Sequence, residues 1–259
     1  ALVADHRVPV LSATGSTAMG KQVGPKLAER FARAILELGG NNAAIIAPSA
    51  DLDLALRGIA FAAMGTAGQR CTTLRRLIVH ESIYEKLVAK LRSVYGSVKV
   101  GDPREAGVLV GPLIDKGAFD NMEKSLAEAK ALGAKITGGA RVSVGGHADA
   151  YYVAPALVEM PSHTGPVLRE TFAPILYVMT YKNFEDAIAM QNAVSAGLSS
   201  SLFTLDMREA ELFVSDVGSD CGIANVKSLQ INSTGFGLRK MFSRTPNSLS
   251  RALAPVRLS

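Results

Sequence analysis

The sequence predicts an α/β fold in which helices flank an open, mostly parallel sheet. The main observation is that short β-rich runs alternate with segments of helical periodicity through the first 226 residues, which is typical of βαβ units. The second is the composition: 48% of the 259 residues are hydrophobic and 20% are charged. This supplies a large buried core and excludes a mainly disordered or collagen-like chain. The length fits one large domain or two smaller ones.

Strands are predicted where short apolar runs occur, at residues 8–13, 43–47, 77–80, 175–180, 201–204 and 222–226. Helices are predicted where apolar residues recur every three or four positions, at residues 20–31, 52–65, 81–95, 115–132, 183–192 and 207–217. The helix over 81–95 is amphipathic, because its apolar side chains fall on one face. Gly133 follows the helix over 115–132 and is expected at its C-cap.

The formal net charge of +5 is concentrated at one end of the chain. Residues 227–259 hold six basic residues and no acid, which leaves 22 basic against 23 acidic residues in 1–226. This segment has no sustained apolar periodicity and is predicted to be unstructured. A basic tail could bind nucleic acid. However, its cations are scattered and its only aromatic residues are Phe236 and Phe242. We therefore expect no nucleic-acid partner.

Two cysteines, Cys71 and Cys221, are too few for a disulfide framework and suit a reducing cytoplasm. No apolar run reaches the ~18 residues of a membrane span, and residues 1–20 lack a signal-peptide pattern. No membrane association is therefore predicted. The four histidines are far apart, without metal-ligand spacing, so no metal site is predicted.

Cys71 lies between a helix rich in small residues and a predicted strand. The adjacent Arg70 would favour a thiolate, and a thiolate can attack a carbonyl carbon. The alternative is a buried cysteine that acts as a small hydrophobic side chain.

Glu37 stands inside an apolar run that ends at Gly39 and Gly40. Burial would raise the pKa of its carboxyl group and make it a usable general base. The alternative is a glutamate at the end of a strand that points to solvent. The stretch from Thr14 to Lys21 follows a strand and opens a helix, so its backbone N–H groups could bind phosphate. Its serine or threonine could equally be an N-cap.

Taken in order, four segments resemble motifs of the aldehyde dehydrogenase superfamily. They are Thr14-Gly15-Ser16-Thr17 through Gly20, Glu37-Leu38-Gly39-Gly40-Asn41, Gly68-Gln69-Arg70-Cys71 and Glu170-Thr171-Phe172-Ala173-Pro174. The 34 residues from Glu37 to Cys71 match the family interval, whereas Ala173 replaces the usual glycine. Gly-Gln-Arg-Cys-Thr-Thr and Leu-Gly-Gly-Asn-Asn resemble the antiquitin-like branch, which oxidises α-aminoadipic semialdehyde. The resemblance covers roughly residues 1–226.

The resemblance implies an NAD(P)-dependent oxidation of an aldehyde to its carboxylate, with NAD as the expected cofactor. Cys71 would attack the aldehyde to give a thiohemiacetal, and its backbone N–H would be one oxyanion donor. Hydride transfer to the nicotinamide would leave a thioester, and Glu37 would activate the water that hydrolyses it. Arg70 would face the carboxylate of the substrate. The other implied positions bind the cofactor: Thr14, Gly15 and Ser16 beside the nicotinamide and phosphates, Leu38 in the nicotinamide pocket, Glu170 at the ribose and Phe172 nearby.

The resemblance also implies a division of the chain. Residues 1–38 would be the C-terminal remnant of a Rossmann-like cofactor domain, 39–226 the catalytic domain and 227–259 a divergent basic tail from an out-of-frame or foreign end. Family members are about twice this length and form homo-oligomers through a hairpin that has no counterpart here. A missing upstream asparagine would remove one oxyanion donor and cost about 10²–10³ in rate. The isolated chain is therefore expected to be weakly active or inactive. The alternative is a non-catalytic truncated remnant or an interaction module.

Overall fold

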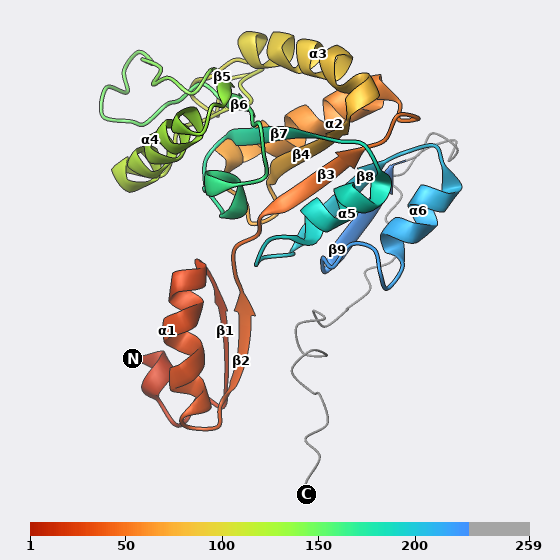
Figure 1. Cartoon of the computed structure of the whole chain (residues 1–259). Helices are drawn as coiled ribbons and strands as arrows, with labels where there is room; N and C mark the ends of the chain where they lie inside the picture. Colours follow the sequence, from red (N-terminus) through yellow and green to blue (C-terminus); the bar gives the residue numbers. More distant parts are fainter. Residues whose placement is uncertain (228–259) are drawn as a thin grey trace, which may run out of the picture. The chain divides into compact units, whose positions relative to one another are not determined.

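The computed structural model describes residues 1–227, which divide into two compact units (Figure 1). The first unit is Ala1–Gly40, and the second begins at Asn41. The sequence places a domain boundary between residues 38 and 39. The predicted tail lies outside the described residues except for Lys227, which ends the last strand.

The first unit is a βαβ element preceded by a short 3-10 helix, η1 (Leu2–Ala4). Strands β1 (Val10–Thr14) and β2 (Arg33–Glu37) pair in parallel, and α1 (Thr17–Ala28) connects them. Gly20 lets α1 approach the end of β2, because a Cβ at Gly20 would lie 2.6 Å from Cδ1 of Leu38. The helix predicted over 20–31 thus starts and ends earlier. Phe31 adopts a φ of 56° and turns the chain into β2, a strand that the periodicity did not predict.

The second unit is built on a seven-stranded sheet in the order β5-β6-β7-β4-β3-β8-β9. All neighbouring strands are parallel except β5 and β6, which are antiparallel. The strands are β3 (Asn42–Ile46), β4 (Leu74–His80), β5 (Lys135–Thr137), β6 (Ala156–Glu159), β7 (Ile175–Tyr181), β8 (Ser199–Phe203) and β9 (Ile223–Lys227). The prediction of an open, mostly parallel sheet with flanking helices is therefore confirmed.

Helices cover both faces of this sheet. α2 and α5 both contact β4 and β7, and Figure 1 shows them on opposite sides of the strands. The α-helices are α2 (Leu52–Met64), α3 (Tyr84–Ser97), α4 (Lys116–Ala131), α5 (Phe184–Asn192) and α6 (Met207–Val214). Three 3-10 helices, η2 (Gly65–Gly68), η3 (Glu81–Ile83) and η4 (Gly165–Leu168), join them. Within residues 1–227, none of the helices is both long and apolar enough to cross a membrane.

Most predicted elements are present, with shifted ends. Gly133 follows α4 with a φ of 86°, as expected for a glycine that ends a helix. The strand predicted at 77–80 begins at Leu74 and includes Arg75 and Arg76, which are only 2% and 1% exposed. β5 and β6 were not predicted, because three and four residues are too few to show a period.

Arg76 fixes the C-terminal end of α5 to the sheet. Its Nη1 donates to the carbonyl of Met190 at 2.8 Å and its Nη2 to that of Gln191 at 2.9 Å. These are orphan carbonyls of the last helical turn, where a cation is favourable. Nη1 also lies 3.1 Å from Nε2 of His163. Arginine has no acceptor atom, so Nε2 of His163 must be the acceptor and the ring must be neutral.

The partly buried position of His163 makes the stability of the second unit dependent on pH. Burial, together with the charge of Arg76, lowers the pKa of His163 from 6.5 to about 4. Between these values the unfolded chain binds a proton that the native state does not, so stability falls as the pH drops from 6.5 toward 4. His163→Gln keeps an acceptor and should remove about 1–2 kcal/mol of that loss, a value discounted for partial exposure. Urea unfolding at pH 7 and pH 4.5 measures the difference, and His6→Gln at an exposed position is the control.

Candidate active site

Cys71 follows a left-handed turn at the end of α2. Thr66, Ala67 and Gly68 have φ values of 57°, 51° and 69°. For residues other than glycine this region is strained, and such strain persists only where surrounding contacts hold it. Position 68 also has no room for a side chain, because a Cβ there would lie 2.3 Å from the carbonyl oxygen of Ala173. The turn thus brings the Cys71 loop (residues 68–73) against the Glu170 segment (residues 170–174).

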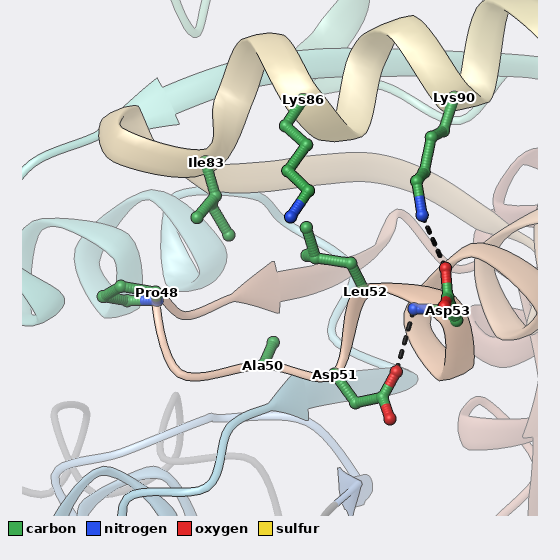
Figure 2. A pocket seen from close by; sticks show the side chains of 8 residues that line it. All are labelled: Pro48, Ala50, Asp51, Leu52, Asp53, Ile83, Lys86 and Lys90. Atoms are coloured by element: carbon green, nitrogen blue, oxygen red, sulfur yellow. Dashed lines mark hydrogen bonds and ion pairs between the residues drawn. The ribbon is translucent and has the colours of Figure 1, made fainter.

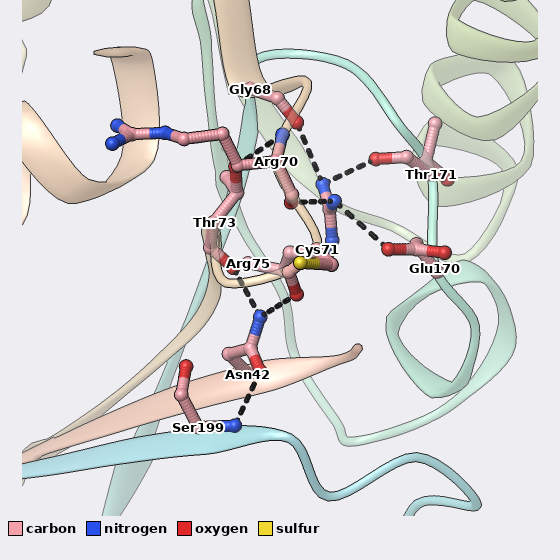
Figure 3. Close-up of polar contacts among 9 residues, drawn as sticks. All are labelled: Asn42, Gly68, Arg70, Cys71, Thr73, Arg75, Glu170, Thr171 and Ser199. Atoms are coloured by element: carbon pink, nitrogen blue, oxygen red, sulfur yellow. Dashed lines mark hydrogen bonds and ion pairs between the residues drawn. The ribbon is translucent and has the colours of Figure 1, made fainter. Parts of the chain in front are cut away.

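The side chain of Asn42 holds the Cys71 loop to the start of β3 (Figure 3). Its Nδ2 donates to the carbonyls of Cys71 and Thr73, both at 2.8 Å. Its Oδ1 accepts from the backbone N–H of Ser199 at 2.9 Å. The amide is therefore fixed between two strands. Cys71 itself is a free thiol with intermediate exposure, so the loop is held while its side chain stays accessible.

The buried Arg75 guanidinium joins the Cys71 loop to the Glu170 segment (Figure 3). On the loop side it donates to the carbonyls of Gly68 at 3.2 Å and Arg70 at 3.0 Å. On the other side it donates to the carbonyl of Thr171 at 2.7 Å and to Oε1 of Glu170 at 3.1 Å. One side chain therefore connects both sequence motifs.

Arg75 also interacts electrostatically with the Cys71 loop. Burial lowers the pKa of Arg75, and the negative charges of Glu170 and then of an ionised Cys71 oppose that shift. The Arg70 guanidinium points away from the thiol (Figure 3) and packs over the Phe61 ring, 5.2 Å from its centroid. Adjacency in sequence therefore does not bring the Arg70 guanidinium to the thiol, because successive side chains of the loop diverge (Figure 3).

Four predicted residues lie at the same end of the second unit: Cys71, Arg70, Glu170 and Phe172. They stand at or just before the amino ends of β4 and β7, neighbouring parallel strands. Glu170 is half-buried, whereas Phe172 is 43% exposed. Arg75 lies over the Phe172 ring, with Cζ 5.4 Å from the ring centroid.

The other five predicted residues are in the first unit. Thr14 and Glu37 end β1 and β2 as a register pair, and the N–H of Gly15 donates to the carbonyl of Glu37 at 3.0 Å. The Ser16 side chain accepts from the N–H of Met19 at 3.1 Å and is the N-cap of α1. The capping interpretation of this stretch is thus confirmed.

Glu37 is exposed, so the expectation of a buried carboxyl group is wrong. The alternative of a strand-end glutamate that faces solvent fits, because Glu37 is the last residue of β2. Leu38, which follows it, is half-buried and packs against Gly20 of α1.

The end of β1 leads into a helix N-terminus, which is the place where βαβ units bind dinucleotides. In βαβ units such cofactors bind beyond the carboxyl ends of the strands, with phosphate at the following helix N-terminus. β1 leads through Gly15 and Ser16 directly into the first turn of α1, which carries no acidic residue. These residues therefore fit a nucleotide phosphate.

A separate cavity of about 300 Å³ lies between the start of α2 and α3, lined by Pro48, Ala50, Asp51, Leu52, Asp53, Ile83, Lys86 and Lys90 (Figure 2). Its two aspartates already have partners. Asp51 caps α2 by accepting from the N–H of Asp53 at 2.8 Å, and Asp53 pairs with Lys90 at 2.5 Å. No predicted site residue lines it. Across residues 1–227, His, Cys, Asp and Glu form no group of three or more that could hold a metal ion.

The sequence interpretation missed Asn42 and Arg75. In the sequence, both are polar residues that lie next to a motif. Asn42 follows the Glu37 motif, and Arg75 lies four positions after Cys71. The arginine pair just before a predicted apolar strand was a signal for a buried polar network. A charged side chain is buried at such a position only where acceptors surround it.

Comparison with known proteins identifies the family. The model described as "Aldehyde dehydrogenase family" matches residues 1–239. The match continues past residue 226, where the resemblance of the motifs was expected to end. The chain thus stays similar to the family into the basic segment.

Relatives and solved structures agree with this match. Aldehyde dehydrogenase family 7 member A1 of Malus domestica is 48% identical over 227 residues, which are 87% of this chain and 44% of the relative. The α-aminoadipic semialdehyde dehydrogenase of Rattus norvegicus is 46% identical over 227 residues, 87% of this chain and 42% of the relative. The crystal structure of an NAD-dependent aldehyde dehydrogenase from Sinorhizobium meliloti has a TM-score of 0.81 and 29% identity, covering 90% of this chain and 45% of that one. The chain thus spans less than half the length of these proteins. In sequence and in fold, it belongs to the aldehyde dehydrogenase family.

Proposed function

We propose that this chain carries the nucleophilic cysteine of an NAD-dependent aldehyde dehydrogenase, and that its substrate is α-aminoadipic semialdehyde. One observation supports the role of Cys71 above others. Its loop has the carbonyls of residues 68, 70, 71 and 73 bound by two buried side chains, Arg75 and Asn42, while the thiol stays accessible. A nucleophile requires this combination of fixed position and access. The substrate proposal is supported by the similarity of this chain to α-aminoadipic semialdehyde dehydrogenases.

In the proposed reaction the Cys71 thiolate attacks the aldehyde carbon, so a carbon–sulfur bond forms and the carbonyl oxygen becomes an oxyanion. The backbone N–H of Cys71 would donate to that oxyanion. Oxidation of this thiohemiacetal to the thioester requires a hydride acceptor, which NAD would supply when bound. The resulting thioester stays on Cys71 until water hydrolyses it and frees the carboxylate product and the thiol.

Glu37 is the proposed general base for this hydrolysis. Its carboxylate is open to solvent at the end of β2, so it can bind a water molecule directly. The residues proposed to hold the cofactor are Thr14, Gly15 and Ser16 at the phosphates and nicotinamide, Leu38 and Phe172 at the nicotinamide and Glu170 at the ribose.

Arg70 is the proposed partner of the substrate carboxylate. Its present contacts are weak, because Nη2 is 3.5 Å from the Phe61 carbonyl and the buried Nε has no hydrogen-bond partner among residues 1–227. A guanidinium held mainly by packing on a ring can turn toward a carboxylate at small cost, and the resulting pair would be bidentate.

We also propose a cytoplasmic location. Cys71 and Cys221 are both free thiols, which suits a reducing compartment.

Cys71→Ser should abolish NADH formation from α-aminoadipic semialdehyde and NAD, because serine is a far weaker nucleophile without an adjacent base. In the wild-type chain, iodoacetamide should label Cys71 about tenfold faster than it labels a free thiol added to the same solution. Peptide mass spectrometry measures the rate of labelling. Cys221→Ser, at a buried position, is the matched control and should leave both results unchanged. Labelling of Cys71 no faster than a free thiol would show that the site is not assembled and would favour a non-catalytic remnant.

Glu37→Gln should slow turnover about 10²-fold or more, because the thioester loses its general base. The acylated Cys71 should then accumulate, and intact-mass spectrometry after mixing with aldehyde and NAD detects it. Glu29→Gln, an exposed position in the same unit, should behave as wild type. A Glu37→Gln protein that turns over normally would remove Glu37 from the mechanism.

Arg70→Met should raise the KM for α-aminoadipic semialdehyde about tenfold and leave that for propanal unchanged, since propanal has no carboxylate to pair. Steady-state kinetics with both aldehydes gives the comparison, with the exposed Arg57→Met as control. An equal rise for both substrates would contradict carboxylate recognition.

A further inference from the structure

We propose that Arg75 is a positioning residue that holds the Cys71 loop and the Glu170 segment as one body. This proposal rests on the proposed function, in which Cys71 reacts with the aldehyde and Glu170 contacts the cofactor. The guanidinium of Arg75 would then help to fix the position of one relative to the other. None of the four segments that resemble family motifs includes Arg75. It hydrogen-bonds to Glu170 directly, and it binds the Cys71 loop through the carbonyls of Gly68 and Arg70.

Arg75 donates hydrogen bonds to both segments. Gly68 and Arg70 accept from Arg75 on the loop side, and Thr171 and Glu170 accept on the other. Each terminal nitrogen serves both sides, since Nη1 reaches Gly68 and Thr171 while Nη2 reaches Arg70 and Glu170. This pattern requires a planar fork with donors along two edges, which lysine does not have.

Two further contacts press the segments together around this fork. The Phe172 ring packs against the guanidinium, and Gly68 lies directly against the backbone of Ala173 and Pro174. Arg75 is 2% exposed, so water cannot replace a lost acceptor. A shift of the Glu170 carboxylate must therefore be followed by the guanidinium and by the carbonyl of Arg70, next to the nucleophile.

Hydrogen exchange can test this coupling in the full chain. In Arg75→Lys, amides of residues 66–73 and 169–174 should both exchange about tenfold faster, which corresponds to the loss of one or two hydrogen bonds. Arg76→Lys is the matched control, because the neighbouring arginine is equally buried but binds the carbonyls of Asn41, Met190 and Gln191. It should loosen residues 41–42 and 188–193 and leave residues 169–174 unchanged.

A second readout separates positioning from a general loss of stability. The rate at which iodoacetamide alkylates Cys71 is measured with and without saturating NAD. In the wild type and in Arg76→Lys, NAD should change this rate by a common factor. In Arg75→Lys that factor should fall to about one, because Glu170 no longer moves with the loop.

The outcomes distinguish the two proposals. Faster exchange in only one of the two segments, or the same pattern in Arg76→Lys, would overturn the role of Arg75. NAD without effect on any of the proteins would count against the proposed function, and the exchange result would still decide the role of Arg75. If Arg75→Lys does not fold, Glu170→Gln gives the same comparison. It should speed exchange in both segments and leave residues 188–193 unchanged, and exchange confined to 169–174 would contradict the coupling.

Discussion

The buried guanidinium of Arg75 is the constraint on which the candidate active site depends. Removing such a charge from water is strongly unfavourable, and it is tolerated only where acceptors surround it. Here three backbone carbonyls and the carboxylate of Glu170 provide them. Because these acceptors belong to two segments about a hundred residues apart in the chain, satisfying one charge also determines how the segments meet. The need of the buried guanidinium for acceptors therefore also fixes the geometry between the two segments.

The strained turn before Cys71 follows from the same contacts. Thr66 and Ala67 would not adopt left-handed backbone angles in isolation, and Gly68 could not carry a side chain against Ala173. Arg75 and Asn42 bind the carbonyls that leave this turn, so their hydrogen bonds offset its strain. The accessibility of the Cys71 side chain and the rigidity of its backbone therefore have a common origin.

The sequence predicted the α/β class and the positions of Cys71 and Glu170, because strand and helix periods are local and the motifs are specific. It did not predict the direction of Arg70, since adjacency along a turning loop says nothing about where a side chain points. The pattern around Glu37 left a buried carboxyl group and a strand-end glutamate facing solvent both open, and the structure agrees with the second. Arg75 and Asn42 were missed since their partners come from distant segments, which a single sequence does not bring together.

The two arginines at the start of β4 also help to determine the register of that strand in the sheet. Every residue from Leu74 to Val79 is buried, so the apolar pattern is the same on both faces and cannot by itself specify the register of the strand. Arg75 and Arg76 point to opposite faces, each into its own set of carbonyls. A slip by one residue would place one arginine in the wrong set and a leucine in the other, leaving several acceptors without a donor. In β4, therefore, charge provides the alignment that hydrophobicity cannot.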